Sequence, residues 1–117
     1  MAKYFKKSEF ACQCGCGYDD VHDELLELLD AAREMAGIPF RINSGCRCKK
    51  HNAAVGGKTD SAHTRGYAAD IACTSSHNRW LIKRALYACG AKRIGHHERF
   101  IHVDVDPTLP QEVEFKY

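Results

Sequence analysis

The chain has 117 residues, of which 44% are hydrophobic and 27% charged, a composition typical of one globular domain. The formal net charge is only +2 and the basic residues are scattered, which argues against a nucleic-acid-binding protein. No apolar run suits a membrane span or a signal peptide. We therefore expect a single domain over residues 1–117, a monomer with no membrane or nucleic-acid partner. It would be cytoplasmic as synthesised, and a lysis system or phage particle would have to deliver it elsewhere.

The N-terminal part of the chain is predicted to hold a lead-in and one long helix. Residues 1–18 have no helical period and form an irregular segment whose aromatic residues pack on the core. Over residues 20–36 apolar side chains recur at helical spacing, with Asp20 as the N-cap and with Gly37 and Pro39 ending the helix. The predicted buried stripe consists of Val21, Leu25, Leu28, Leu29, Ala32 and Met35.

Short elements follow in the middle of the chain. Residues 40–43 alternate and predict a short strand, and residues 49–55 predict one or two helical turns. A polar loop over 58–66 leads into an apolar segment, 67–73, which we interpret as a buried strand from which Asp70 projects.

The last third predicts a second main helix and further extended segments. The helix covers residues 75–89 and ends at Gly90, and residues 93–95 are extended. Residues 99–105 alternate as a strand, and the tail after Pro107 adds an edge strand or frays. The predicted inner face of the helix consists of Trp80, Leu81, Ala85, Ala88 and Cys89.

This order of elements predicts the fold class. It contains no βαβ repeat with a glycine fingerprint, which argues against a parallel, doubly wound sheet. We expect an α+β fold in which a small antiparallel sheet is backed by two main helices.

Two histidines and one carboxylate could form a metal site at a face of this sheet. A loop that runs into a strand can fold His63 back over Asp70, and a buried Asp70 would need a partner such as a metal ion. His102 and Asp104 share one face of a strand, so Asp104 could orient the histidine or pair with a cation. Three protein ligands leave a zinc position open for water, as in catalytic zinc sites.

These residues belong to spaced motifs that resemble a known family. The patterns S-x-H-x2-G-x-A-x-D over 61–70 and I-H-V-D over 101–104 resemble the zinc D-Ala-D-Ala carboxypeptidase family, in its small single-domain branch. Residues 43–52 are similar to that branch's S-G-[YF]-R-x3-H-N segment, with Cys46 in place of the aromatic residue, and continue as N-x-x-V-G-G. The family comprises D-Ala-D-Ala carboxypeptidases, dipeptidases and phage endolysins that cut peptidoglycan peptides.

The resemblance, which covers most of the chain, implies roles for individual residues. It implies His63, Asp70 and His102 as Zn²⁺ ligands, and it places Arg47 in the cleft against the substrate carbonyl or carboxylate. A guanidinium fork suits a carboxylate or a developing oxyanion, so Arg47 could be both a substrate-binding and a catalytic residue. Ser61 would hydrogen-bond the substrate or brace its loop.

One position departs from the family pattern. Better-known members carry Asp or Glu three residues before the last zinc histidine as the general base, and Arg99 occupies that place here. Glu98 and His97 are the expected catalytic replacements, with His96 as a further histidine and Asp104 as a candidate if the strand twists.

The cysteines leave three alternatives open. The chain has seven: Cys12, Cys14, Cys16, Cys46, Cys48, Cys73 and Cys89. A structural metal ion could be held by Cys12, Cys14, Cys46 and Cys48, although C-x-C is tighter than the usual zinc spacing. One or two disulfides, or free buried thiols that pack as small apolar residues, are the other two states.

Two functions are compatible with the sequence. The first is a zinc metallopeptidase that hydrolyses peptidoglycan stem peptides, as a carboxypeptidase or an endolysin-type endopeptidase in cell wall degradation. The second is a non-catalytic or weakly active peptidoglycan-binding or phage structural module with the same zinc fold, because the position of the general base is not filled by an acid.

Overall fold

A computed structural model describes residues 3–59 and 61–117, so the first two residues of the lead-in and residue 60 of the polar loop lie outside the description. Within the described residues, no helix is long and apolar enough to cross a membrane. The elements are, in chain order, the 3-10 helix η1 (Lys7–Phe10), α1 (Asp23–Ala36), β1 (Ile42–Ser44), α2 (Lys49–Ala54), the 3-10 helix η2 (Ala62–Arg65), β2 (Ala68–Ala72), α3 (Ser76–Ala88), β3 (Arg93–His96), β4 (Phe100–Asp104) and β5 (Val113–Lys116).

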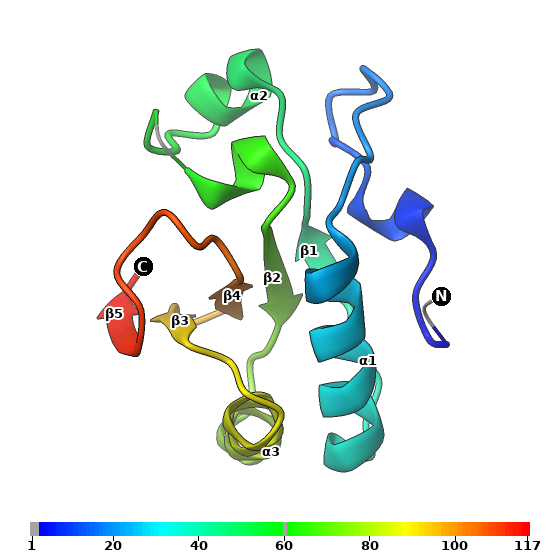
Figure 1. Ribbon diagram of the computed structural model, residues 1–117, viewed down its shortest axis with the longest axis vertical. Helices are drawn as coiled ribbons and strands as arrows, with labels where there is room; N and C mark the ends of the chain where they lie inside the picture. The colour runs from blue at the N-terminus through cyan, green and yellow to red at the C-terminus, as the bar shows by residue number, and fades with distance from the viewer. Residues whose placement is uncertain (1–2, 60) are drawn as a thin grey trace.

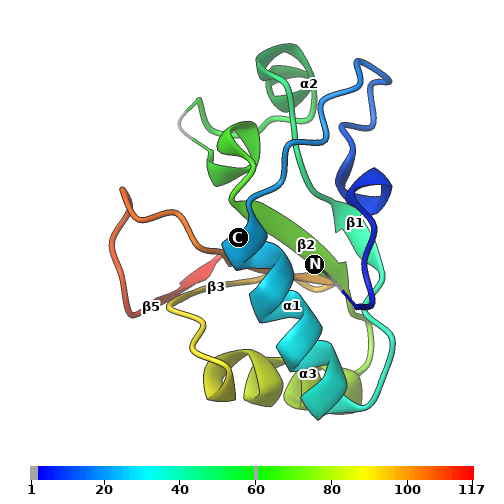
Figure 2. The same ribbon diagram turned by 45° about the vertical axis from the view of Figure 1, so that its right-hand side comes forward.

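The five strands form one sheet in the order β1-β2-β4-β3-β5. All neighbours are antiparallel except β3 and β5, which are parallel. Helices α1 and α3 pack together against one face of the sheet, and α1 crosses in front of β2 in Figure 2, whereas α2 lies at the end of the molecule (Figures 1 and 2). The predicted α+β class is confirmed, and the tail does add an edge strand.

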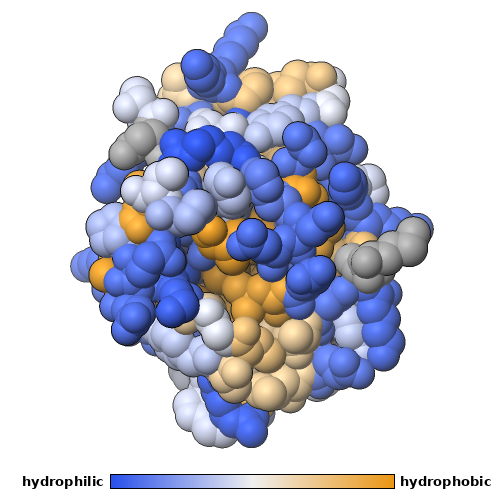
Figure 3. Space-filling model, in the orientation of Figure 1, coloured by the Kyte–Doolittle hydropathy of each residue, from blue (hydrophilic) through white to orange (hydrophobic). Residues whose placement is uncertain are grey.

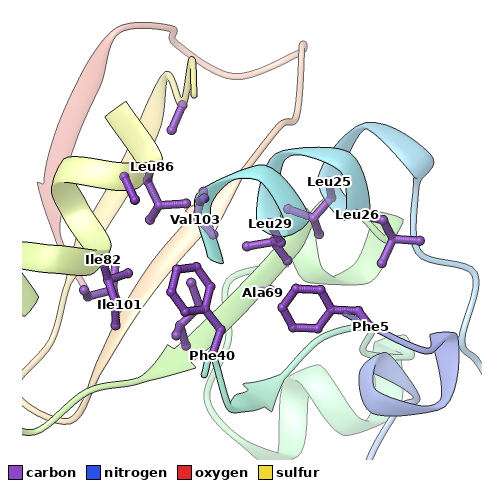
Figure 4. Close-up of a cluster of buried hydrophobic side chains, with 14 of the residues drawn as sticks. Phe5, Leu25, Leu26, Leu29, Phe40, Ala69, Ile82, Leu86, Ile101 and Val103 are labelled. Carbon is purple, nitrogen blue, oxygen red and sulfur yellow. The ribbon is translucent and has the colours of Figure 1, made fainter. Parts of the chain in front are cut away.

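Alternation along the strands separates a core face from a polar face. Ile101 and Val103 of β4 are fully buried against the helices, as are Ala69 and Ile71 of β2. Figure 4 shows Ala69, Ile101 and Val103 meeting the side chains of α1 and α3 around Phe40. The intervening residues of β2 and β4 therefore point to the opposite face, away from α1 and α3.

The lead-in contributes to the same core. It contains η1, so it is less irregular than expected, and its Phe5 and Phe10 rings are buried and packed edge to face at 5.7 Å. Figure 3 shows hydrophilic side chains over most of the α1 and α3 side of the molecule, with apolar ones gathered near its middle.

Helix α1 differs from the prediction at its start and on one edge of its stripe. It begins at Asp23 with His22 as the N-cap, so the expected Asp20 cap is wrong. The backbone N–H of His22 donates to the Gly66 carbonyl, which fixes the chain in an extended conformation up to that residue. Met35 is 46% exposed, because the buried face continues through Leu26 and Ala36 instead.

Helix α3 begins after Ser75, whose hydroxyl accepts the Asn78 N–H as an N-cap. Its inner face is rotated from the prediction. Trp80 is 60% exposed and carries the Arg84 guanidinium over its ring at 5.4 Å, so its inward placement was wrong. Ala88 is exposed as well, and the buried positions are Ile82, Ala85 and Leu86.

Candidate metal centre

Three side chains from separate elements converge on the polar face of the sheet. His63 of η2, Asp70 of β2 and His102 of β4 are all buried, and their potential ligand atoms lie within 4.8 Å of one another. Asp70 Oδ1 is 3.2 Å from His63 Nε2 and 3.0 Å from His102 Nδ1. The structure therefore brings together the three residues that the sequence predicts as metal ligands.

Local structure explains why they meet. The β2–β4 register pairs Asp70 directly with His102, so these two side chains project side by side. The single turn of η2, which ends at Gly66 in the left-handed conformation, folds His63 back over Asp70. A loop leading into a strand thus produces the predicted approach of His63 to Asp70.

The hydrogen bonds on the far side of each imidazole fix its tautomer. His63 Nδ1–H donates to the Gly45 carbonyl at 2.7 Å, and His102 Nε2–H donates to Asp104 Oδ2 at 2.7 Å. In neutral imidazoles, the nitrogens that face Asp70 then carry lone pairs and no proton. Two nitrogen lone pairs and a carboxylate oxygen pointing at one another repel unless a cation lies among them. This donor set fits a divalent ion such as zinc.

The electrostatics of the group also favour a cation. Burial opposes ionisation of Asp70, but its close contacts with His102 and His63 outweigh burial and hold the pKa of this carboxyl well below its usual range. Burial likewise opposes protonation of His102, but its hydrogen bonds to Asp104 and Asp70 raise its pKa above 6.5. Without a metal ion, the site therefore attracts a proton in its place.

Asp104 is committed to holding His102. Its Oδ2 accepts the His102 N–H, while Oδ1 accepts Arg93 Nε–H at 2.7 Å and the Asp106 backbone N–H at 3.3 Å. The side chain is only 1% exposed, so both oxygens are occupied and shielded from solvent. This arrangement suits the predicted orienting role and leaves Asp104 no oxygen free to act as a base.

Arg47 lies beside the same carboxylate. Its guanidinium donates to Asp70 Oδ2 at 3.3 Å, to Ser44 Oγ at 3.1 Å and to Asn52 Oδ1 at 3.3 Å. Asn52 depends on a close approach to Gly57, where an added Cβ would lie 2.0 Å from Asn52 Oδ1. Gly57 of the N-x-x-V-G-G segment therefore leaves the space in which Asn52 accepts its hydrogen bond from Arg47.

A hollow of about 590 Å³ opens next to His102. Ser61 lines it, and Tyr117 stacks on the His102 ring at 4.6 Å. Phe115 lies 5.6 Å from the same ring, in space that exists because Gly95 has no side chain: a Cβ there would be 2.8 Å from the Phe115 ring. The edge strand β5 thus forms one wall of the hollow.

The predicted replacement bases lie farther away. His97 and Glu98 follow β3 and line a separate hollow with Tyr117. The His97 ring stacks on Phe100 at 4.3 Å, Phe100 contacts Tyr117 at 5.4 Å, and Tyr117 in turn covers His102. The structure therefore does not bring His97 or the exposed Glu98 to the three candidate ligands, and their catalytic roles stay predictions.

The remaining side chains of this turn also point elsewhere. Arg99 is exposed. His96 Nε2 lies 3.0 Å from Glu114 Oε2. Since Glu114 also pairs with Lys83 of α3, His96 lies on the helix-covered face of the sheet.

The structure regroups the cysteines that the sequence analysis offered as a second metal set. Cys12, Cys14, Cys16 and Cys48 lie together, with their sulfur atoms within 4.8 Å of one another. Cys46 is not among them, because its side chain is 2% exposed within the hydrophobic core. Burial raises the pKa of the Cys46 thiol to about 11.

Several site residues were not found from the sequence: Ser44, Asn52, Arg93, Phe115 and Tyr117. Asn52 lies in a quoted motif, and the alternation of Val113, Phe115 and Tyr117 signals a strand face. The motif does not show that Asn52 contacts Arg47. The alternation does not show that Phe115 and Tyr117 lie over His102, because that depends on the parallel pairing of β5 with β3.

Comparison with known proteins agrees with this geometry. The family model of peptidase M15 matches residues 3–104, which include the three candidate ligands and Arg47. No curated protein matches the chain significantly. Peptidases of this family are zinc-dependent, in agreement with the donor set described above. The chain therefore belongs to the peptidase M15 family of hydrolytic enzymes.

Proposed function

We propose that this protein is a zinc-dependent peptidase that cleaves peptidoglycan stem peptides, as a D-Ala-D-Ala carboxypeptidase or an endolysin-type endopeptidase. One observation carries the proposal: the outer hydrogen bonds of His63 and His102 leave both inner nitrogens as lone-pair donors that converge on Asp70. Such a site binds a metal ion, and family membership supplies the hydrolytic class.

His63, Asp70 and His102 would hold the ion. Zinc in such a site polarises the scissile carbonyl as a Lewis acid and activates water for attack. Asp104 maintains the donor tautomer of His102. Arg47 offers a guanidinium beside the site, and rotation of that group from Asp70 towards a substrate would let it bind a carboxylate or stabilise a developing oxyanion.

The lining of the hollow agrees with an anionic peptide substrate. The cationic side chains Lys58, Arg93 and Lys116 line it together with the apolar Leu109 and Phe115. Stem peptides combine carboxylates with small apolar side chains, so this mixture of lining groups suits them. Ser61, at the same hollow, offers a hydroxyl for substrate hydrogen bonding or for its own loop.

A second function is favoured by a different observation. Among the described residues that line the hollow next to His102, Asp104 is the only acid, and its oxygens are already occupied. A domain of this kind without a working base would bind stem peptides without cleaving them. It would then serve as a peptidoglycan-binding or phage structural module.

Zinc analysis followed by a turnover assay tests the proposal. The zinc-loaded protein is incubated with purified peptidoglycan, and released D-Ala and cleaved stem peptides are identified by mass spectrometry. We expect cleavage that a chelator and His63→Ala both abolish. Full activity in metal-free protein would contradict the zinc mechanism, whereas saturable binding of stem peptides without cleavage would establish the binding module.

A further inference from the structure

We propose a second, structural zinc site formed by the four sulfur atoms of Cys12, Cys14, Cys16 and Cys48. Three of these residues belong to the lead-in, and the fourth is the N-cap of α2. The site goes beyond the proposed function, because it lies apart from the candidate ligands of the sheet and does not depend on them.

The spacing of the sulfur atoms matches the size of a zinc tetrahedron. The Sγ–Sγ distances are 3.4 Å from Cys12 to Cys14, 3.5 Å from Cys14 to Cys48, and 3.9 Å from Cys12 to Cys48. Zinc–sulfur bonds of about 2.3 Å in a tetrahedron place sulfurs about 3.8 Å apart. Cys16 completes the group, with its sulfur within 4.8 Å of the others.

A cluster of this shape is not that of a disulfide. A disulfide joins two sulfurs at about 2.05 Å and separates them from other thiols. Here the three sulfurs lie 3.4–3.9 Å apart, so each has two close neighbours and no two of them form a separate pair. Uncharged thiols have no strong attraction that would hold four of them together, whereas a shared divalent cation does.

Backbone donors point at the sulfurs, as thiolates require. The N–H of Cys48 donates to Cys12 Sγ at 3.4 Å, and the N–H of His51 donates to Cys48 Sγ at 3.4 Å. Hydrogen bonds of this kind orient and stabilise metal-bound thiolates.

Four protein ligands make the proposed site closed, and therefore structural. The course of the chain links this cysteine site to the candidate metal centre of the sheet. The site fastens the lead-in to the segment that carries Arg47, one residue before Cys48, and the neighbouring Cys46 N–H donates to the Phe10 carbonyl at 2.8 Å. Zinc there would fix the end of the Arg47 segment and the first turn of α2.

Metal stoichiometry tests the proposal. Protein purified with a phosphine reductant and zinc is analysed by mass spectrometry of its metals. We expect two zinc ions per chain in the wild type and in the control Cys89→Ser, whose thiol lies at the end of α3. We expect one in His63→Ala and one in the double variant C14S/C16S. Two ions retained in C14S/C16S, or only one in the wild type that His63→Ala removes, would overturn the proposal.

A spectroscopic measurement needs no cysteine variant, so it stands even if C14S/C16S fails to fold. X-ray absorption at the zinc edge of His63→Ala protein should show a shell of four sulfurs at about 2.3 Å. A shell of nitrogen and oxygen, or disulfides between these cysteines that persist in protein purified with the phosphine reductant, would refute the site. Loss of peptidase activity with an intact sulfur shell would count against the proposed function alone.

Discussion

Replacing Asp104 by asparagine should move a proton within His102. The Asp104 Oδ1 position accepts Arg93 Nε–H at 2.7 Å and the Asp106 N–H at 3.3 Å, so the amide oxygen of an asparagine must take that place. Its NH₂ group then faces His102 Nε2, which in the wild type donates its proton to Asp104. Nε2 becomes an acceptor, and the imidazole proton moves to Nδ1, the atom that points at Asp70.

The expected loss of zinc affinity follows because His102 Nδ1, once protonated, has no lone pair for the metal ion. Mutation of groups that orient metal ligands typically weakens metal affinity about 10- to 100-fold, which corresponds to about 1.4–2.7 kcal/mol. We expect at least this loss for Asp104→Asn, because the substitution reverses the tautomer as well as removing a charge. Competition with a chromophoric zinc chelator measures the affinity, and long-range ¹H–¹⁵N NMR spectra report the tautomer.

Asp106→Asn is the matched control. Asp106 is fully buried two residues farther along, and it accepts hydrogen bonds from Arg65 and Thr108 but none from His102. It loses the same charge by the same substitution. If Asp104→Asn binds zinc as tightly as this control and keeps its proton on Nε2, the tautomer argument for the metal centre is refuted.

Three further predictions test other parts of the account. Arg47→Lys keeps the charge but loses the three-way guanidinium contact with Ser44, Asn52 and Asp70, so kcat/KM for stem peptides should fall about 100-fold with the zinc content unchanged; unaltered kinetics would remove Arg47 from the mechanism. Gly57→Ala drives a Cβ to 2.0 Å from Asn52 Oδ1, and urea unfolding should show a loss of about 1–3 kcal/mol, whereas equal or greater stability would disprove the tight contact. Burial raises the pKa of Asp106, but the hydrogen bonds from Thr108 and Arg65 outweigh burial and lower this pKa below 3.8. Ionised Asp106 therefore stabilises the fold above pH 3.8, and this contribution is lost as the pH falls through the folded-state pKa. The difference in unfolding free energy between wild type and Asp106→Asn, measured in chelator, should therefore shrink as the pH falls, and a difference that grows would contradict the assigned pKa shift.

The sequence contains enough information to predict the three candidate ligands but not what surrounds them. The spaced motifs that hold His63, Asp70 and His102 resemble those of a zinc peptidase family, and this resemblance implies all three as ligands. Period-two alternation marks only the strands of Asp70 and His102, and the structure adds the register of β2 with β4, which places these two residues opposite each other. The orienting role of Asp104 follows from the same alternation, since residues two apart share a face.

Features that depend on tertiary contacts were beyond the sequence. Asp20 has the chemistry of an N-cap, but the chain is held extended by the hydrogen bond from His22 to Gly66, and the N-cap lies two residues later, at His22. Trp80 has the largest side chain of its helix, yet the docking of α3 on α1 leaves it outside. Cys16 replaces Cys46 in the sulfur cluster, because the chain turns at Cys48 to begin α2 and Cys46 enters the core. Local sequence patterns predict which residues share a face of a helix or strand. Tertiary packing determines how far a helix is rotated about its axis and where the chain turns.

Anomalous diffraction at the zinc edge from crystals grown with zinc tests the central claim most directly. The account predicts a peak bonded to His63 Nε2, Asp70 Oδ1 and His102 Nδ1, with His102 Nε2 still donating to Asp104. Crystals grown with zinc that show no peak among these three atoms, and both imidazoles donating protons to Asp70 instead, would contradict it.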